Sequence, residues 1–157
     1  MIKKNLKNII IILIFCLIIG CFSLRPIKIK GNSMYPSLKD GDWVLVNRLA
    51  YVFSDPYRGD IIVFVNDDRD KEYFVKRIIG LGEESIEIKG EAIYIDNDVL
   101  EETYISASIG DNFSKRYIPN NYLFVLGDNR KVSIDSRYKE VGFVNQQHII
   151  GKIILEW

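Results

Sequence analysis

Residues 85–95 read Ser-Ile-Glu-Ile-Lys-Gly-Glu-Ala-Ile-Tyr-Ile and form the clearest β-structure pattern in this chain of 157 residues. Apolar and polar side chains alternate with a period of two on both sides of Lys89-Gly90-Glu91, which is typical of two half-buried strands joined by a tight turn. We therefore predict a β-hairpin whose strands cover 85–89 and 92–95.

The same pattern continues in both directions from this hairpin. After Pro26, short segments rich in Val, Ile, Phe or Tyr are separated by turn residues, and no window suits an amphipathic helix of about 12 residues. We expect a mainly β protein, with 82–121 as a smaller inserted region packed on the main sheet. The further predicted strands cover 43–47, 61–65, 73–79, 122–126 and 149–155.

The N-terminal part differs because it is a continuous apolar run. Residues 9–24 contain no charged side chain and follow three lysines. A helix of this length covers about 24 Å, so it spans a bilayer only where the bilayer thins or flanking side chains snorkel. We predict one transmembrane signal anchor at 9–24, a short cytoplasmic tail at 1–8 and an extracytoplasmic domain at 25–157.

Two other interpretations of the apolar run remain open. Ile18-Ile19-Gly20-Cys21 resembles a lipobox, which would make Cys21 an acylated residue. A cleaved secretory peptide would instead release a soluble protein. No small-x-small site precedes Arg25, which argues against that cleavage.

Charge and composition exclude several classes of function. The chain has 21 basic and 21 acidic residues, but residues 1–24 hold three lysines and no acid, so the remainder is weakly acidic. A domain without a basic stripe argues against a nucleic-acid partner. Both cysteines lie in the apolar run, and His148 is the only histidine. We therefore expect no disulfide, no thiol nucleophile, no metal site and no cofactor in the folded domain.

Ser33 is the candidate nucleophile. It lies in Gly31-Asn32-Ser33-Met34-Tyr35-Pro36, where Gly31 permits close approach of another group and Pro36 restricts the residue before it. A plain turn explains the same pattern. A nucleophilic serine needs a base, and the candidates are His148 or a lysine with a lowered pKa. No acidic partner for His148 is evident, so we expect that histidine to be structural.

Lys76 is the candidate base, because strand alternation places it on the same face as Phe74 and Ile78. Burial on an apolar strand face disfavours the ammonium form and lowers the pKa of a lysine. No acid occurs between residues 73 and 82 to hold the proton. A neutral amine there can act as a general base. The structural alternative is a lysine that extends along the strand to water.

A third cluster covers 127–137 and reads Gly-Asp-Asn-Arg-Lys-Val-Ser-Ile-Asp-Ser-Arg. One interpretation is a solvated loop braced by Asp–Arg pairs. The other is a set of groups that orient a neighbouring side chain, with Ser133 as a hydroxyl able to hydrogen-bond an amine.

Taken together, these residues resemble the type I signal peptidases, membrane-anchored serine proteases that remove signal peptides from exported proteins. The resemblance covers nearly the whole chain, and the compact length is similar to that of the short, single-anchor bacterial members. After the apolar segment come five motifs in the family's order: Gly-Asn-Ser-Met-Tyr-Pro-Ser-Leu, Gly-Asp-Trp-Val-Leu-Val-Asn, Arg-Gly-Asp-Ile-Ile-Val-Phe, Val-Lys-Arg-Ile-Ile-Gly-Leu and Gly-Asp-Asn-Arg-x-x-Ser-x-Asp-Ser-Arg.

The resemblance implies an antiparallel β-sheet catalytic core with a small inserted β subdomain, preceded by one N-terminal transmembrane helix. It implies Ser33 as nucleophile and Lys76 as general base. The implied substrates are preprotein signal peptides cut after small-x-small sites, with the lipid bilayer and the secretion translocon as neighbours and no cofactor.

The resemblance also implies supporting residues. Ser133 would orient the lysine, and Asp135 with Arg77 and Arg137 would form a structural charge network. The backbone N–H of the nucleophile would form part of an oxyanion hole. Gly31 stands where some members supply a hydroxyl to that hole, so a second donor must come from backbone or water.

Two rival functions remain open. Self-cleaving repressors also pair serine with lysine, but they need a DNA-binding region or a cytoplasmic setting, which the apolar N-terminus contradicts. The other rival is a membrane-tethered β binding module without catalysis. The joint presence of Ser33, Lys76 and Ser133 argues against it.

Overall fold

A computed structural model describes residues 8, 10, 11, 20, 23–66, 72–105 and 112–156 of the chain. Cys21, the tail at 1–7 and most of the predicted anchor at 9–24 lie outside these residues. Within the part of the chain that the structure describes, no helix is both long enough and apolar enough to cross a membrane.

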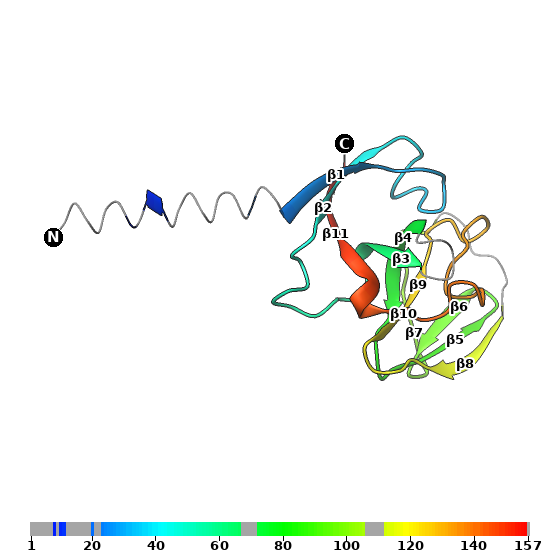
Figure 1. The fold of residues 1–157 in the computed structure, drawn as a ribbon. Helices are drawn as coiled ribbons and strands as arrows, with labels where there is room; N and C mark the ends of the chain where they lie inside the picture. Colours follow the sequence, from blue (N-terminus) through cyan, green and yellow to red (C-terminus); the bar gives the residue numbers. More distant parts are fainter. Residues whose placement is uncertain are drawn as a thin grey trace.

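The described residues form two antiparallel sheets (Figure 1), which confirms the predicted mainly β class. The larger sheet has the strand order β1-β2-β11-β3-β4-β9-β10. Its strands are β1 Leu24–Lys28, β2 Trp43–Asn47, β3 Ile61–Asn66, β4 Glu72–Gly80, β9 Tyr122–Leu126, β10 Val144–Asn145 and β11 Ile149–Glu156. A 3-10 turn, η1 Gln146–His148, separates the last two strands of the chain.

The smaller sheet has the order β7-β6-β5-β8. Its strands are β5 Ser85–Lys89, β6 Ala92–Ile95, β7 Asp98–Val99 and β8 Phe113–Tyr117. β5 and β6 form the predicted hairpin, in which Ile86 pairs with Ile95 and Ile88 pairs with Ile93. The period-two pattern therefore predicted both strands correctly, and the observed register places the isoleucines of the two strands opposite each other.

The smaller sheet packs on the β4 and β9 region of the larger one through a shared apolar cluster. This cluster joins isoleucines of β5 and β6 to Ile79, Phe124 and Leu126. At the end of β4 the fit is close, because a Cβ on Gly80 would overlap the terminal methyl carbon of Ile118 and lie 3.2 Å from the Phe124 Cβ. The two sheets thus share one core beside the strand that carries Lys76.

Seven predicted strands are present, and the described residues form four others that were not predicted. β1 contains Pro26 and has mostly exposed side chains, while β8 reads Phe-Ser-Lys-Arg-Tyr and is exposed along most of its length. Both are edge strands of their sheets, where polar residues and proline are tolerated. β7 and β10 have two residues each, too few for a periodic pattern.

Candidate active site

Ser33 lies in the loop that connects β1 to β2, and two buried side chains fix this loop. Met34 and Leu38 insert into an apolar cluster with Val44, Val46 and other residues of the larger sheet. Gly31 adopts a φ of +82°, a conformation that favours glycine, and its N–H donates to Asp40 at 2.7 Å. The serine itself is only partly buried.

Lys76 lies in the middle of β4, between β3 and β9 in the larger sheet. Its Nζ donates to Ser33 Oγ at 2.9 Å and to the Val75 carbonyl at 3.0 Å. The same ammonium lies 5.6 Å from the centre of the Phe74 ring, which agrees with the predicted shared face. The fold therefore brings together two residues 43 positions apart in the sequence, at hydrogen-bond distance.

The environment of Lys76 disfavours a charged amine. The residue is only 3% exposed, and burial lowers its pKa from 10.5 to about 8. The carboxylates of Asp135 and Asp128 oppose this shift, while Arg137 adds to it. The local sequence contains no acid, as noted above, but the fold places two acids of the 127–137 loop within electrostatic range.

Ser133 is buried close to this pair without contacting the amine. Its Oγ has no hydrogen-bond partner, so the implied bond from Ser133 to Lys76 is not formed in this arrangement. Gly127 lies between the two serines, because a Cβ at that position would overlap both Ser133 Oγ and the Ser33 carbonyl oxygen. Ser33 and Ser133 thus approach the same glycine from two separate loops.

The 127–137 loop is also bonded directly to the Ser33 loop. The Asn129 N–H donates to the Ser33 carbonyl at 3.0 Å, and the Ser133 N–H donates to the Asn129 carbonyl at 3.1 Å. These backbone bonds place the candidate nucleophile relative to the loop that carries Ser133.

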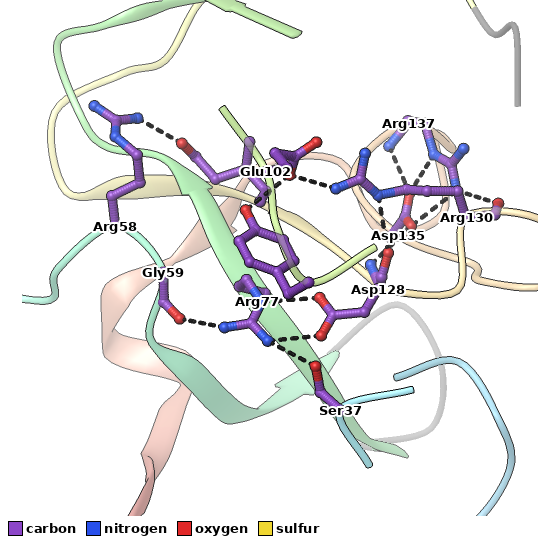
Figure 2. A network of polar contacts seen from close by, with 12 residues as sticks. Ser37, Arg58, Gly59, Arg77, Glu102, Asp128, Arg130, Asp135 and Arg137 are labelled. Atoms are coloured by element: carbon purple, nitrogen blue, oxygen red, sulfur yellow. Dashed lines mark hydrogen bonds and ion pairs between the residues drawn. The ribbon is translucent and has the colours of Figure 1, made fainter. Parts of the chain in front are cut away.

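Arg77 follows Lys76 on β4 and is held by a different acid from the one expected. It binds Asp128 through two bonds, from Nε at 2.8 Å and from a terminal nitrogen at 2.6 Å (Figure 2). Asp135 pairs with Arg137 instead, at 2.8 Å. The expected network of Asp135 with both arginines is therefore two pairs, and the strand arginine belongs to Asp128.

Arg77 makes further contacts that tie together three parts of the chain. It donates to the Gly59 carbonyl at 2.8 Å and to Ser37 Oγ at 3.1 Å (Figure 2). Its guanidinium also lies 4.0 Å from the centre of the Tyr104 ring. The β2–β3 connection, the Ser33 loop and the segment after β7 all meet at this one side chain.

Several residues at the site were not singled out from the sequence. Asp128 and Asn129 lie in the quoted 127–137 motif, so their signal was present, but their partners depend on the fold. Glu102 and Tyr104 lie in a polar stretch without periodicity, and no sequence signal identifies them. His148 ends η1 at the start of β11, whereas the hydrogen bond to Ser33 Oγ comes from Lys76. Among the described residues, no cluster of potential metal ligands is present.

Comparison with known proteins gives one consistent answer. Residues 2–157 match the family model described as signal peptidase, peptidase S26. The chain is 34% identical to signal peptidase I of Bacillus amyloliquefaciens over 92% of its own length and 79% of that protein. It is 35% identical to signal peptidase I S of Bacillus subtilis, over 92% of its own length and 83% of the relative.

A solved structure agrees with these relatives. The chain resembles the crystal structure of a signal peptidase I from Enterococcus faecalis with a TM-score of 0.58 and 32% identity, over 64% of this chain and 98% of that one. A serine and a buried lysine at hydrogen-bond distance fit a serine peptidase of this kind. The chain therefore belongs to the signal peptidase family S26, the serine peptidases that remove signal peptides.

Proposed function

We propose that this signal peptidase cleaves its substrates with Ser33 as the nucleophile and Lys76 as the general base. The observation that carries the proposal is the 2.9 Å contact between Lys76 Nζ and Ser33 Oγ, made by an amine whose pKa burial lowers to about 8. An amine with that pKa is partly neutral near physiological pH and can accept a proton.

The chemistry proceeds in two stages. Ser33 Oγ attacks the carbonyl carbon of the scissile bond while Lys76 takes the hydroxyl proton, and the resulting ammonium returns that proton to the departing amine. This leaves an acyl-enzyme and a free amino terminus. Lys76 then deprotonates water, which attacks the ester carbonyl, and the ammonium protonates Ser33 Oγ as the acyl group leaves.

The supporting residues hold this pair in place. In our proposal Ser133, which lies against Gly127 beside the Ser33 backbone, orients the amine, while Asp135, Arg77 and Arg137 fix the surrounding strands and loops through their ion pairs. The N–H of Ser33 contributes to the oxyanion hole. Gly31 has no hydroxyl to offer, so the second donor comes from backbone or water.

The location of the enzyme is part of the proposal. The apolar run at 9–24 acts as a transmembrane anchor, and the domain at 25–157 lies on the extracytoplasmic face, with 82–121 inserted in it. Ser33 follows Leu24 by nine residues, which keeps the site near the bilayer and the secretion translocon. Preproteins whose apolar segments are still in the membrane, cut after small-x-small sites, suit this position. Intact-mass analysis of membrane-extracted protein tests the anchor. A chain that still begins at Met1 supports the anchor and excludes acylation at Cys21.

Preprotein processing in liposomes tests the proposed pair of residues. Ser33→Ala and Lys76→Ala should each abolish cleavage, with the new amino terminus of the parent product read by mass spectrometry. Lys89→Ala serves as the matched control, because Lys89 is an exposed strand lysine paired with Glu87. Cleavage at the parental rate by either site variant contradicts the proposal. A folded parent that cleaves no preprotein favours the binding-module alternative.

A further inference from the structure

Glu102 is a buried carboxylate for which the mechanism above assigns no role. Its side chain is 5% exposed and forms a salt bridge with Arg130, itself 6% exposed, at 2.5 Å (Figure 2). The Tyr104 hydroxyl donates to the same carboxylate oxygen at 2.8 Å. Two buried charges and a phenol are therefore organised around a single residue of the segment that follows β7.

The Glu102 cluster reaches both elements of the proposed dyad. Arg130 Nε donates at 3.0 Å to the carbonyl of Gly127, the residue packed between Ser33 and Ser133. On the other side, the Tyr104 ring lies against the guanidinium of Arg77, the neighbour of Lys76 on β4. Glu102 is thus bonded to Arg130, which belongs to the 127–137 loop, and to Tyr104, which contacts the lysine strand.

The same segment is anchored in the smaller sheet. The Leu100 N–H donates to the Ile93 carbonyl at 2.8 Å, and both Leu100 and Tyr104 pack against the apolar cluster beneath β5 and β6. The segment that carries Glu102 is therefore attached to the smaller sheet by a backbone hydrogen bond and by apolar packing. Removal of this carboxylate would leave Arg130 buried without its ion-pair partner, which loosens the loop that it braces.

We infer that Glu102, with Tyr104, is a positioning residue that sets the spacing between Ser33 and Lys76 from the smaller sheet. This inference rests on the proposed function. Loss of the contacts that Glu102 makes with Arg130 and Tyr104 allows the 127–137 loop and β4 to shift relative to each other. A misplacement of reacting groups by about 1 Å costs on the order of a hundredfold in rate, without a matching loss of substrate binding.

Preprotein cleavage by the full chain in liposomes, measured as kcat and KM across pH, tests the inference. Glu102→Ala should lower kcat by about 10-fold or more while KM changes by less than about twofold. Water entering the loosened site should raise the pKa of Lys76, so the acidic limb of the pH profile moves to higher pH. The charged groups acting on that amine are Asp135, Asp128 and Arg137, and all three are retained in this variant.

Two further variants keep the test decisive if Glu102→Ala does not fold. Glu102→Gln keeps an acceptor for Arg130 and should recover part of kcat, and Tyr104→Phe keeps the ring but removes its bond to the carboxylate. The matched control is Glu84→Ala, which breaks a partly buried pair with Arg58 at 2.6 Å. It should leave kcat and the pH profile unchanged.

Amide hydrogen exchange gives a readout that does not depend on activity. The Asn129 N–H, which donates to the Ser33 carbonyl, should exchange about 10-fold faster in Glu102→Ala, while the Ile78 N–H in β4 should not change. Unchanged kcat and unchanged Asn129 exchange would overturn the inference, as would an equal acceleration of both amides, which indicates global destabilisation. If the parent cleaves no preprotein, the proposed function fails and the exchange result alone decides the role of Glu102.

Discussion

Lys76 and Arg77 are neighbours on β4, and their side chains have opposite environments. The lysine amine has a serine hydroxyl and a carbonyl as its hydrogen-bond partners, and burial lowers its pKa. The arginine is held by two bonds to Asp128 and by the Tyr104 ring, and its pKa is raised by that carboxylate despite burial. A buried cation without a carboxylate partner is prepared for proton transfer, whereas a paired cation holds the scaffold together.

The largest expected effect comes from replacing Lys76 with arginine, so that it carries the same group as its neighbour Arg77. Lys76→Arg places a guanidinium that cannot lose its proton where the base must be neutral. We expect preprotein cleavage to fall by about a thousandfold, since general-base catalysis contributes about 10²–10⁴ in rate. Cleavage assays with Lys89→Arg as control measure this. Substantial activity in the site variant would show that the amine is not the base.

Asp128→Asn tests the ion pair between Arg77 and Asp128. Asp128 is fully buried, and its removal leaves Arg77 without a counter-ion, so we expect a loss of about 3 kcal/mol in the free energy of unfolding. Urea denaturation measures this value. Glu84→Gln breaks the more exposed pair with Arg58, and its expected cost is below about 1 kcal/mol. Equal losses of unfolding free energy in Asp128→Asn and Glu84→Gln would contradict the proposed difference between the buried and the more exposed ion pair.

Removal of the Lys76 amine should raise the free energy of unfolding, whereas removal of the Asp128 carboxylate should lower it. The folded pKa of Lys76 lies near 8 and the ordinary value is 10.5, so below pH 8 the folded state carries a destabilising charge. Lys76→Met should therefore be more stable than the parent at pH 7, by about 2–3 kcal/mol. The advantage should shrink as the pH rises from about 8 to about 10.5, where the unfolded lysine also becomes neutral. Urea denaturation at pH 7 and pH 10 tests the sign.

The smallest expected effect is a change in pH profile. The rate constant kcat/KM should rise with pH and level off above an apparent pKa of about 8, since only the neutral amine accepts the serine proton. Asp135→Asn removes the acid that contributes most to holding that proton, and it also removes the negative charge that offsets the nearby positive charge of Arg137. Both changes lower the pKa of Lys76, so the acidic limb should move to lower pH. Movement to higher pH would contradict this electrostatic account.

The sequence predicted the parts of the molecule that depend on local pattern. Alternation in 73–79 indicated the strand and the face of Lys76, and the hairpin at 85–95 is present as predicted. The alternative of a lysine that extends to water is wrong, because Lys76 is buried. Pairing partners were harder to predict, because Asp128 and Asp135 lie in one loop and either could reach Arg77. The sequence also gave no reason to associate Glu102 with Arg130, since their contact depends on how the two sheets pack.

Gly127 lies between Ser33 and Ser133, and its lack of a side chain allows these two residues to lie close together. Any larger residue at this position must separate the two serines, because backbone on one side and a buried hydroxyl on the other leave no room for a methyl group. An alanine at 127 would therefore inactivate the enzyme without touching a reacting atom. A residue with no side chain thus restricts which amino acids this site can accept, although it takes no part in the reaction.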